Sequence, residues 1–199
     1  MTRLLDFSRA VEARDPYSSG HAARVMVLAE VVAARLGLDE TEIEVVRMGA
    51  ALHDIGKLAV SQNVIGKAGP LSEHELAEVR GHPVAGARMI ELVRPLRPAL
   101  PAILHHHERW DGRGYPEGLE GPEIPVEARI LAVADTFDAM TSDRVYRRAQ
   151  PPQNAVEELH RFAGTQFDPM VVSCFIDNLE RIVREVSPRL LAEPAASLA

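Results

Sequence analysis

The residues most able to do chemistry stand together at 53–57, where the sequence reads His-Asp-Ile-Gly-Lys. If this segment is helical, His53 and Lys57 share one face and Asp54 lies beside them. Apolar residues precede the histidine, and a buried His-Asp pair is costly unless another group compensates it. A divalent metal would do so, because imidazole and carboxylate together suit manganese, iron or zinc. For the dipeptide alone, a His-Asp hydrogen bond at a helix end is an equally good explanation.

Further histidines and one aspartate favour the metal interpretation. They are His21, His82, His106, His107 and Asp135. The histidines fall at expected helix ends or turns, and the aspartate interrupts an apolar stretch, where an unpaired carboxylate would be forced to protonate. Each alone has an ordinary explanation as a cap, a turn residue or a satisfied polar group. One centre explains them together: two metals bridged by Asp54, spaced about 3.5–4 Å as in enzymes that hydrolyse phosphoesters.

The composition restricts the class of protein. Of 199 residues, 46% are apolar and 26% charged, as in ordinary soluble globular proteins. The net charge of −7 would repel polyanions, so we expect no nucleic-acid polymer as a partner. No apolar run approaches the roughly 20 residues of a membrane span, and charges come too early for a secretory signal. The lone Cys174 fits a reducing compartment. We therefore predict a cytoplasmic protein that engages no membrane.

The elements that must position these side chains are predicted to be helices. Apolar residues recur at helical spacing through most of the chain, and the segment 72–75 matches a capping box. The expected helices span 21–36, 40–55, 72 onward, 83 to about 92, 98–108, 125–140, 152–162 and 169–186. The glycine- and proline-rich stretches 63–72 and 111–125 are predicted loops. The predicted fold is all-α: a single-domain helical bundle over residues 1–186, with a frayed tail at 187–199.

Several residues close to these motifs are not expected to take part. On a helix, His105 points about 100° away from His106, so it would lie at the surface or behind the ligands. The other candidates are expected at the surface (His74, His160 and Arg24), in the core (Cys174) or as a loop anchor (Trp110).

The motifs, taken in their order, resemble those of the HD-GYP family, a branch of the HD-domain metal-dependent phosphohydrolases. The matching segments are GHAARV (20–25), ALHDIGKLAV (51–60), GHPVAG (81–86), HHERWDGRGYP (106–116), ARILAVADTFDAMTSDRVYR (128–147) and FDP (167–169). HDIGK combined with HHE and DGRGYP is highly specific, whereas HD alone is not. The resemblance covers about residues 10–175 and implies an HD-type helical bundle with a structured GYP loop.

The resemblance implies a role for each matched residue. The metal ligands would be His21, His53, Asp54, His82, His106, His107 and Asp135, holding two divalent ions, iron or manganese, with Asp54 as the bridge. Catalysis would rest on Asp54 and Lys57, and the substrate would be bound by Lys57, Tyr115, Arg144 and Arg147. The implied reaction is hydrolysis of cyclic di-GMP to linear pGpG. A diguanylate cyclase would be one candidate for a regulatory partner.

One position departs from the family pattern. Some members hold a third metal with a glutamate four residues before the first histidine ligand, but Tyr17 stands there in this chain, with Glu12 and Asp15 out of register. We therefore expect two metals, and pGpG rather than GMP as the main product. Two alternatives stay open: an HD-type phosphohydrolase acting on another nucleotide, and a dinucleotide-binding or protein-interaction module with little catalysis. Retention of the whole ligand set favours an enzyme.

Overall fold

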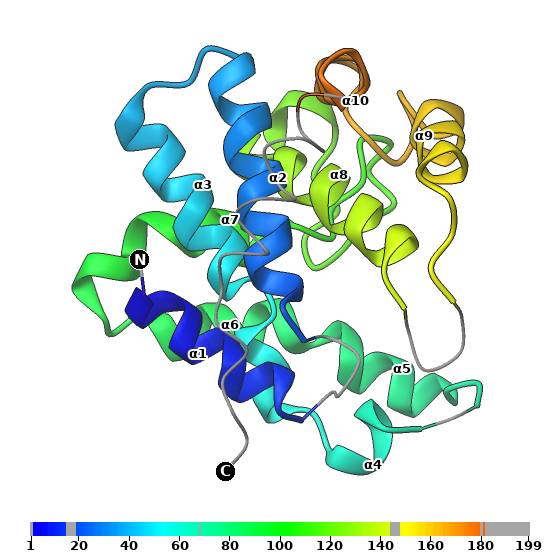
Figure 1. Cartoon of the computed structure of the whole chain (residues 1–199). Helices are drawn as coiled ribbons and strands as arrows, with labels where there is room; N and C mark the ends of the chain where they lie inside the picture. Colours follow the sequence, from blue (N-terminus) through cyan, green and yellow to red (C-terminus); the bar gives the residue numbers. More distant parts are fainter. Residues whose placement is uncertain (1, 15–18, 68, 144–147, 180, 182–199) are drawn as a thin grey trace, which may run out of the picture.

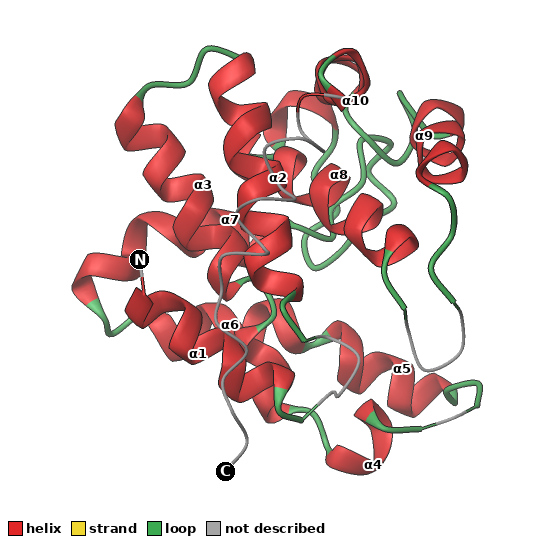
Figure 2. Ribbon diagram, in the orientation of Figure 1, coloured by secondary structure: helices red, strands yellow, loops and turns green. Residues whose placement is uncertain are grey.

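The structure is a computed structural model that describes residues 2–14, 19–67, 69–143, 148–179 and 181. Every regular element in these ranges is a helix, as predicted, and strand-like pairing is limited there to two isolated bridges (Figure 2). The α-helices are α1 (Thr2–Glu12), α2 (His21–Arg35), α3 (Glu40–Leu52), α4 (Gln62–Ile65), α5 (Glu73–Arg80), α6 (His82–Ile90), α7 (Leu100–His105), α8 (Val126–Thr141), α9 (Pro152–Arg161) and α10 (Pro169–Asp177). Three short 3-10 helices are η1 (Ile55–Ala59), η2 (Arg94–Ala99) and η3 (Gly121–Glu123).

Helices α2, α3 and α8 pack against one another and enclose the apolar core (Figure 1). Val25, Val46 and Ile130, one from each helix, are completely buried. Helix α7 packs against both α3 and α8, and α9 and α10 pack against α8. Burial of these apolar faces holds the helix ends in fixed positions. None of the helices in the described ranges has the length and apolarity that crossing a membrane requires.

Two of the described α-helices begin with a capping box. At α5, the Ser72 side chain accepts from the backbone of Glu75, and the Glu75 carboxylate accepts from the backbone of Ser72, which confirms the predicted box. Asp39 and Glu42 make the same reciprocal pair at α3. These caps satisfy backbone N–H groups that a helix leaves unpaired, so both helices begin at defined residues.

The predicted helix 40–55 would have included the start of the HDIGK segment, but the observed helix ends before it. Helix α3 ends at Leu52, and the chain turns through His53 and Asp54 into η1. Gly56 makes this turn fit against α6, because a Cβ at that position would collide with the His82 carbonyl. The glycine therefore lets the HDIGK turn approach a second metal-ligand candidate closely.

The predicted helix 98–108 is shorter than expected. Prolines at 95 and 98 lack the N–H that an α-helix needs, so Arg94–Ala99 forms η2 and α7 covers only Leu100–His105. The last predicted helix, 169–186, is described as α10 as far as Asp177. The predicted tail at 187–199 lies outside the described residues. Helices α1 and α4 add to the helices expected from the sequence, and α4 takes residues 63–65 of the predicted loop 63–72.

Candidate metal centre

Five elements that are distant in sequence bring the predicted ligands to one place. His21 begins α2, the His53-Asp54 pair follows α3, His82 begins α6, His106 and His107 follow α7, and Asp135 lies within α8. Two groups have ligand atoms within 4.8 Å of one another: His21, His53 and Asp54, and His82, His106 and His107. Asp135 joins the first group, because its Oδ1 lies 3.2 Å from Nε2 of His21. We call these the carboxylate group and the three-histidine group.

Three histidines are oriented by the same local hydrogen bond. Each has Nδ1 next to the backbone carbonyl three residues earlier: His53 with Ala50 (2.8 Å), His82 with Val79 (2.7 Å) and His106 with Ile103 (2.8 Å). A carbonyl only accepts, so each Nδ1–H donates and each Nε2 presents a lone pair to the centre. Metal-ligating histidines are commonly fixed in this way.

The lone pairs that these three Nε2 atoms present to the centre suit a cation better than they suit one another. Nε2 of His82 and Nε2 of His106 face each other at 3.2 Å, although neither carries a proton to donate. Nε2 of His53 is buried and has no hydrogen-bond partner among the described residues. Unpaired buried acceptors are rare because they cost free energy. A divalent metal would engage all three nitrogens, so the donor set fits the predicted metal.

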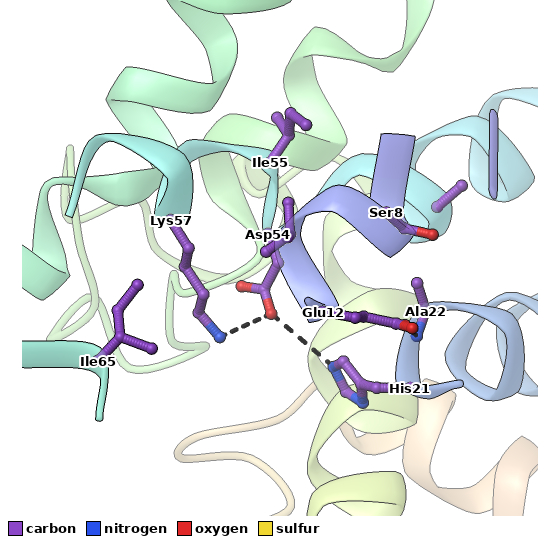
Figure 3. A pocket seen from close by; sticks show the side chains of 10 residues that line it. Ser8, Glu12, His21, Ala22, Asp54, Ile55, Lys57 and Ile65 are labelled. Atoms are coloured by element: carbon purple, nitrogen blue, oxygen red, sulfur yellow. Dashed lines mark hydrogen bonds and ion pairs between the residues drawn. The ribbon is translucent and has the colours of Figure 1, made fainter. Parts of the chain in front are cut away.

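Asp54 lies between the two groups. Its Oδ2 is 3.5 Å from Nε2 of His53 and 3.9 Å from Nε2 of His21, and its Oδ1 is 3.5 Å from Nε2 of His82. Lys57 approaches from another side, and its Nζ donates to Oδ2 at 2.6 Å (Figure 3). Burial alone would raise the pKa of Asp54, but Lys57 and the histidines hold it well below its usual range. The carboxylate is therefore ionised, as a bridging ligand must be.

His21 is held by carboxylates at both ring nitrogens. Nδ1 lies 2.7 Å from Oδ2 of Asp138, on the opposite side of the ring from Asp135. Burial lowers the pKa of His21, but hydrogen bonds to Asp135 and Asp138 outweigh this effect and raise it to about 9. The same contacts hold the pKa of Asp135 and of Asp138 below their usual range, against burial. His21 thus takes a proton that a metal would displace.

Asp138 was missed in the sequence, and the expectation for Arg24 was wrong. Asp138 is buried, and Arg24 donates to both of its oxygens, from Nε at 2.5 Å and from a terminal nitrogen at 3.1 Å. Arg24 is therefore half-buried behind the centre rather than a surface charge. The available signal was spacing: Asp138 follows Asp135 by three residues, so both carboxylates share one face of α8.

The three-histidine group has the opposite electrostatics. Burial, Lys57 and His53 lower the pKa of His82. Burial and the neighbouring histidines hold the pKa of His106 well below its usual range. Burial and His82 lower the pKa of His107 to about 4. All three rings are therefore neutral near pH 7, as metal ligands must be.

The end of α1 ties together the segments that carry His21 and Lys57. The carboxylate of Glu12 accepts from the backbone N–H groups of Gly20 and Ala22, at the start of α2. Two residues later, Arg14 donates to the carbonyls around η1: Lys57 (3.3 Å), Leu58 (2.6 Å) and Val60 (2.9 Å). Both contacts satisfy backbone groups at helix ends. Neither was expected from the sequence.

The loop that follows α7 carries Tyr115 to the three-histidine group. Glu108 is buried, and its carboxylate accepts from the backbone of Glu117 and Gly118. Gly114 passes so close to the Glu108 backbone that a Cβ would collide with it. The ring of Tyr115 consequently stacks on His107, with centroids 4.9 Å apart. Glu108 is a further residue that sequence reasoning missed.

The structure agrees with some of the expectations for the remaining residues and differs from others. His74 and His160 are exposed, as expected. His105 lies outside both ligand groups and is buried behind them, with Nδ1 3.7 Å from Glu108. Trp110 is half-buried against Gly121 and Arg129, as a loop anchor would be. Cys174 packs against the core but is only partly buried. Arg144, Arg147 and Tyr17 lie outside the described residues.

The helices of this bundle bring together two sets of imidazole and carboxylate side chains. Fold and site together define a class of protein: an all-α protein built around a candidate metal centre. The HD-domain family model matches residues 7–171. The chain therefore belongs to the HD-domain family, in its HD-GYP branch, as the motifs predicted.

Similar proteins agree with this assignment. The chain is 41% identical over 175 residues to the cyclic di-GMP phosphodiesterase response regulator RpfG of Xanthomonas campestris, an alignment that covers 87% of this chain and 46% of that protein. It is 36% identical over 169 residues to the 3'3'-cGAMP-specific phosphodiesterase 3 of Vibrio cholerae, covering 85% and 36%. The crystal structure of a V. cholerae cyclic GMP-AMP-specific phosphodiesterase has the same fold, with a TM-score of 0.72 at 18% identity, covering 97% and 53%. The chain spans less than half the length of these two curated relatives.

Proposed function

We propose that the protein is a metal-dependent phosphodiesterase that hydrolyses cyclic di-GMP to linear pGpG. One observation carries this proposal: His53, His82 and His106 have each committed Nδ1 to a backbone carbonyl and present Nε2 to one place beside Asp54. Such a centre suits phosphoester hydrolysis, and a relative at 41% identity is named for this reaction.

Two divalent ions, iron or manganese, would occupy the centre. The first would be held by the carboxylate group, His21, His53, Asp54 and Asp135, and the second by the three-histidine group, His82, His106 and His107. Asp54 is the bridging candidate because its two oxygens face different groups. When bound, such ions lower the pKa of water and neutralise charge on the phosphate oxygens.

The chain's own residues would bind and orient the substrate. Lys57 presents an ammonium group beside Asp54, where it would hold a phosphate oxygen of the diester being cut. Tyr115, Arg144 and Arg147 are proposed to contact the dinucleotide, on the strength of the motif resemblance. Since Tyr17 replaces the glutamate that some family members use for a third metal, we expect pGpG to accumulate and conversion to GMP to be slow.

Other parts of the proposal rest on sequence alone. We place the protein in the cytoplasm, with regulation through a protein partner such as a diguanylate cyclase. The domain limits, 1–186 with a tail at 187–199, stay a prediction.

The test is a time course with cyclic di-GMP, using anaerobically purified protein loaded with ferrous iron or manganese. We expect pGpG first and little GMP. Absence of turnover with either metal, with both sites loaded, would favour the alternative of a binding or interaction module with little catalysis. Stoichiometric GMP without a pGpG intermediate would contradict the two-metal interpretation of Tyr17.

The same assay addresses the substrate alternative. Relatives of this chain include enzymes named for cyclic di-GMP and for 3'3'-cGAMP, at 41% and 36% identity. We favour cyclic di-GMP on the higher identity. Parallel measurements of kcat/KM for both dinucleotides should favour cyclic di-GMP, and a reversed preference would transfer the proposal to the mixed dinucleotide.

A further inference from the structure

Arg80 is a cation fixed at the edge of the metal centre that no motif singled out. It is the last residue of α5, two positions before His82, and its exposed guanidinium carbon lies 5.6 Å from the centroid of the Tyr115 ring. That ring stacks on His107, with an interplanar angle of 22°. Arg80, Tyr115 and His107 therefore form one stack that runs outward from the three-histidine group. Contact of a guanidinium with an aromatic ring is attractive and limits where the charge can lie.

The donors of Arg80 are free for a ligand. Among the described residues, Arg80 makes no hydrogen bond or ion pair with the protein. A guanidinium carries five N–H donors around its edge, and a ring contact leaves that edge open. Phosphate oxygens match this planar arrangement of donors.

Two other cations near the centre, among the residues that the structure describes, are already paired with carboxylates. Lys57 donates to Asp54, and Arg24 donates to Asp138. A cyclic dinucleotide has two phosphodiesters and therefore two negative charges, and it must approach a chain of net charge −7. The diester being cut would lie against the ligand nitrogens and Lys57. The second diester belongs to the same macrocycle and must lie a short distance away, where a cation at the edge of the centre could bind it.

We propose that Arg80 binds the second, uncut phosphodiester of the cyclic dinucleotide, and that Tyr115 is the positioning residue that holds its guanidinium. This inference rests on the proposed function above. It adds a positioning role for Tyr115 to the substrate contact proposed above, because its ring contacts both His107 and Arg80.

The experiment compares Arg80→Ala and Arg80→Lys with the unmutated holoenzyme. Arg88→Ala, at an exposed arginine of α6, is the matched control. Loss of a charge-assisted hydrogen bond should raise KM for cyclic di-GMP about tenfold in Arg80→Ala, with kcat within about twofold. Arg80→Lys should recover part of the loss, and Arg88→Ala should match the unmutated protein. With bis(p-nitrophenyl) phosphate, which has a single phosphate, KM should stay unchanged in all variants.

The outcomes separate this inference from the proposed function. If KM for cyclic di-GMP is unchanged in Arg80→Ala, or if KM rises equally for the single-phosphate compound, the role of Arg80 is wrong while the phosphodiesterase stands. If the unmutated protein binds but does not cut the dinucleotide, calorimetric Kd values replace KM with the same expected change, and equal Kd values overturn the inference. If the unmutated protein neither binds nor cuts it, both proposals fail. Metal content and thermal melting of each variant identify a misfolded protein. If Arg80→Ala is misfolded, the KM of Arg80→Lys tests the role of Arg80.

Discussion

The two halves of the metal centre use the same residue type in opposite electrostatic states. In the three-histidine group, burial and the neighbouring His82 lower the pKa of His107 to about 4, and no carboxylate of the described residues hydrogen-bonds to its ring. In the carboxylate group, His21 lies between Asp135 and Asp138, and its pKa rises to about 9 although it is more deeply buried than His107. Burial alone therefore does not decide the charge of a histidine; the hydrogen-bond partners do. One half is ready for a metal, and the other must release a proton to bind one.

Removing Asp54 should break both halves at once, and this is the largest effect expected. Its oxygens lie 3.5 Å from His53 in one group and 3.5 Å from His82 in the other. Asp54→Ala should lower kcat/KM for cyclic di-GMP by more than about a hundredfold and reduce bound metal, because the ligand shared by both groups is lost. Steady-state kinetics and elemental analysis measure this. Asp177→Ala, at an exposed aspartate of α10, is the control; full metal content and normal turnover in Asp54→Ala would exclude the shared ligand.

Removing a histidine from one group should break only that half. His106 lies within the three-histidine group, where its Nε2 faces that of His82 at 3.2 Å. His106→Ala should therefore lose the metal of its own group and keep the other, and His53→Ala should do the reverse. Metal stoichiometry per chain, measured after equilibration with manganese, shows the number retained. Retention of the full metal complement in His106→Ala would mean that the groups are not separate sites.

Asp138→Asn tests whether the two groups are supported separately, because it removes a charge behind the carboxylate group alone. Asp138 accepts from His21 and from Arg24 without reaching the three-histidine group. Loss of such a supporting carboxylate should weaken the metal of the carboxylate group about ten- to a hundredfold. Metal titration followed by calorimetry resolves the two affinities. The matched variant is Glu108→Gln, which alters the buried carboxylate of the GYP loop. Equal weakening at both sites in Asp138→Asn would show that Asp138 does not act on its own half.

The smallest effect concerns the stability of chelator-treated protein as a function of pH. The pKa of His21 rises from 6.5 to about 9, so its contribution is present below pH 6.5 and is lost as pH rises towards 9. The pKa of His107 falls from 6.5 to about 4, so the folded state binds fewer protons than the unfolded state, and stability is lost as pH falls from 6.5 towards 4.

The free energy of unfolding, measured by urea denaturation between pH 4 and 9, should consequently peak near pH 6.5. His21→Ala should flatten the alkaline side, and His107→Ala the acidic side. A curve whose alkaline side is unchanged in His21→Ala would contradict the assigned proton on His21.

The sequence by itself determined the all-α fold and the residues that form the centre. Helical periodicity located the helices because apolar spacing reports directly on the face that is buried. The seven predicted ligands could be picked out because each stands at a place where an unpaired imidazole or carboxylate would be costly. The structure brings them together through the packing of the helices that carry them. The predicted boundaries failed where backbone geometry intervened, at the prolines of η2 and at the turn through Gly56.

Only the tertiary structure decided which residues support those ligands and which protonation state each ligand has. Arg24, Asp138 and Arg14 look like ordinary surface residues in the sequence, yet each contacts a segment distant in sequence. Glu12 likewise gives no sign that it bonds to the start of the next helix. The stack of Arg80, Tyr115 and His107 likewise joins α5 to the loop after α7. Hydrogen bonds and charge interactions act over a few ångströms in space, and a sequence pattern cannot show which distant residues meet. For the same reason the opposite protonation states of His21 and His107 follow from their neighbours across the fold, and not from their places in the chain.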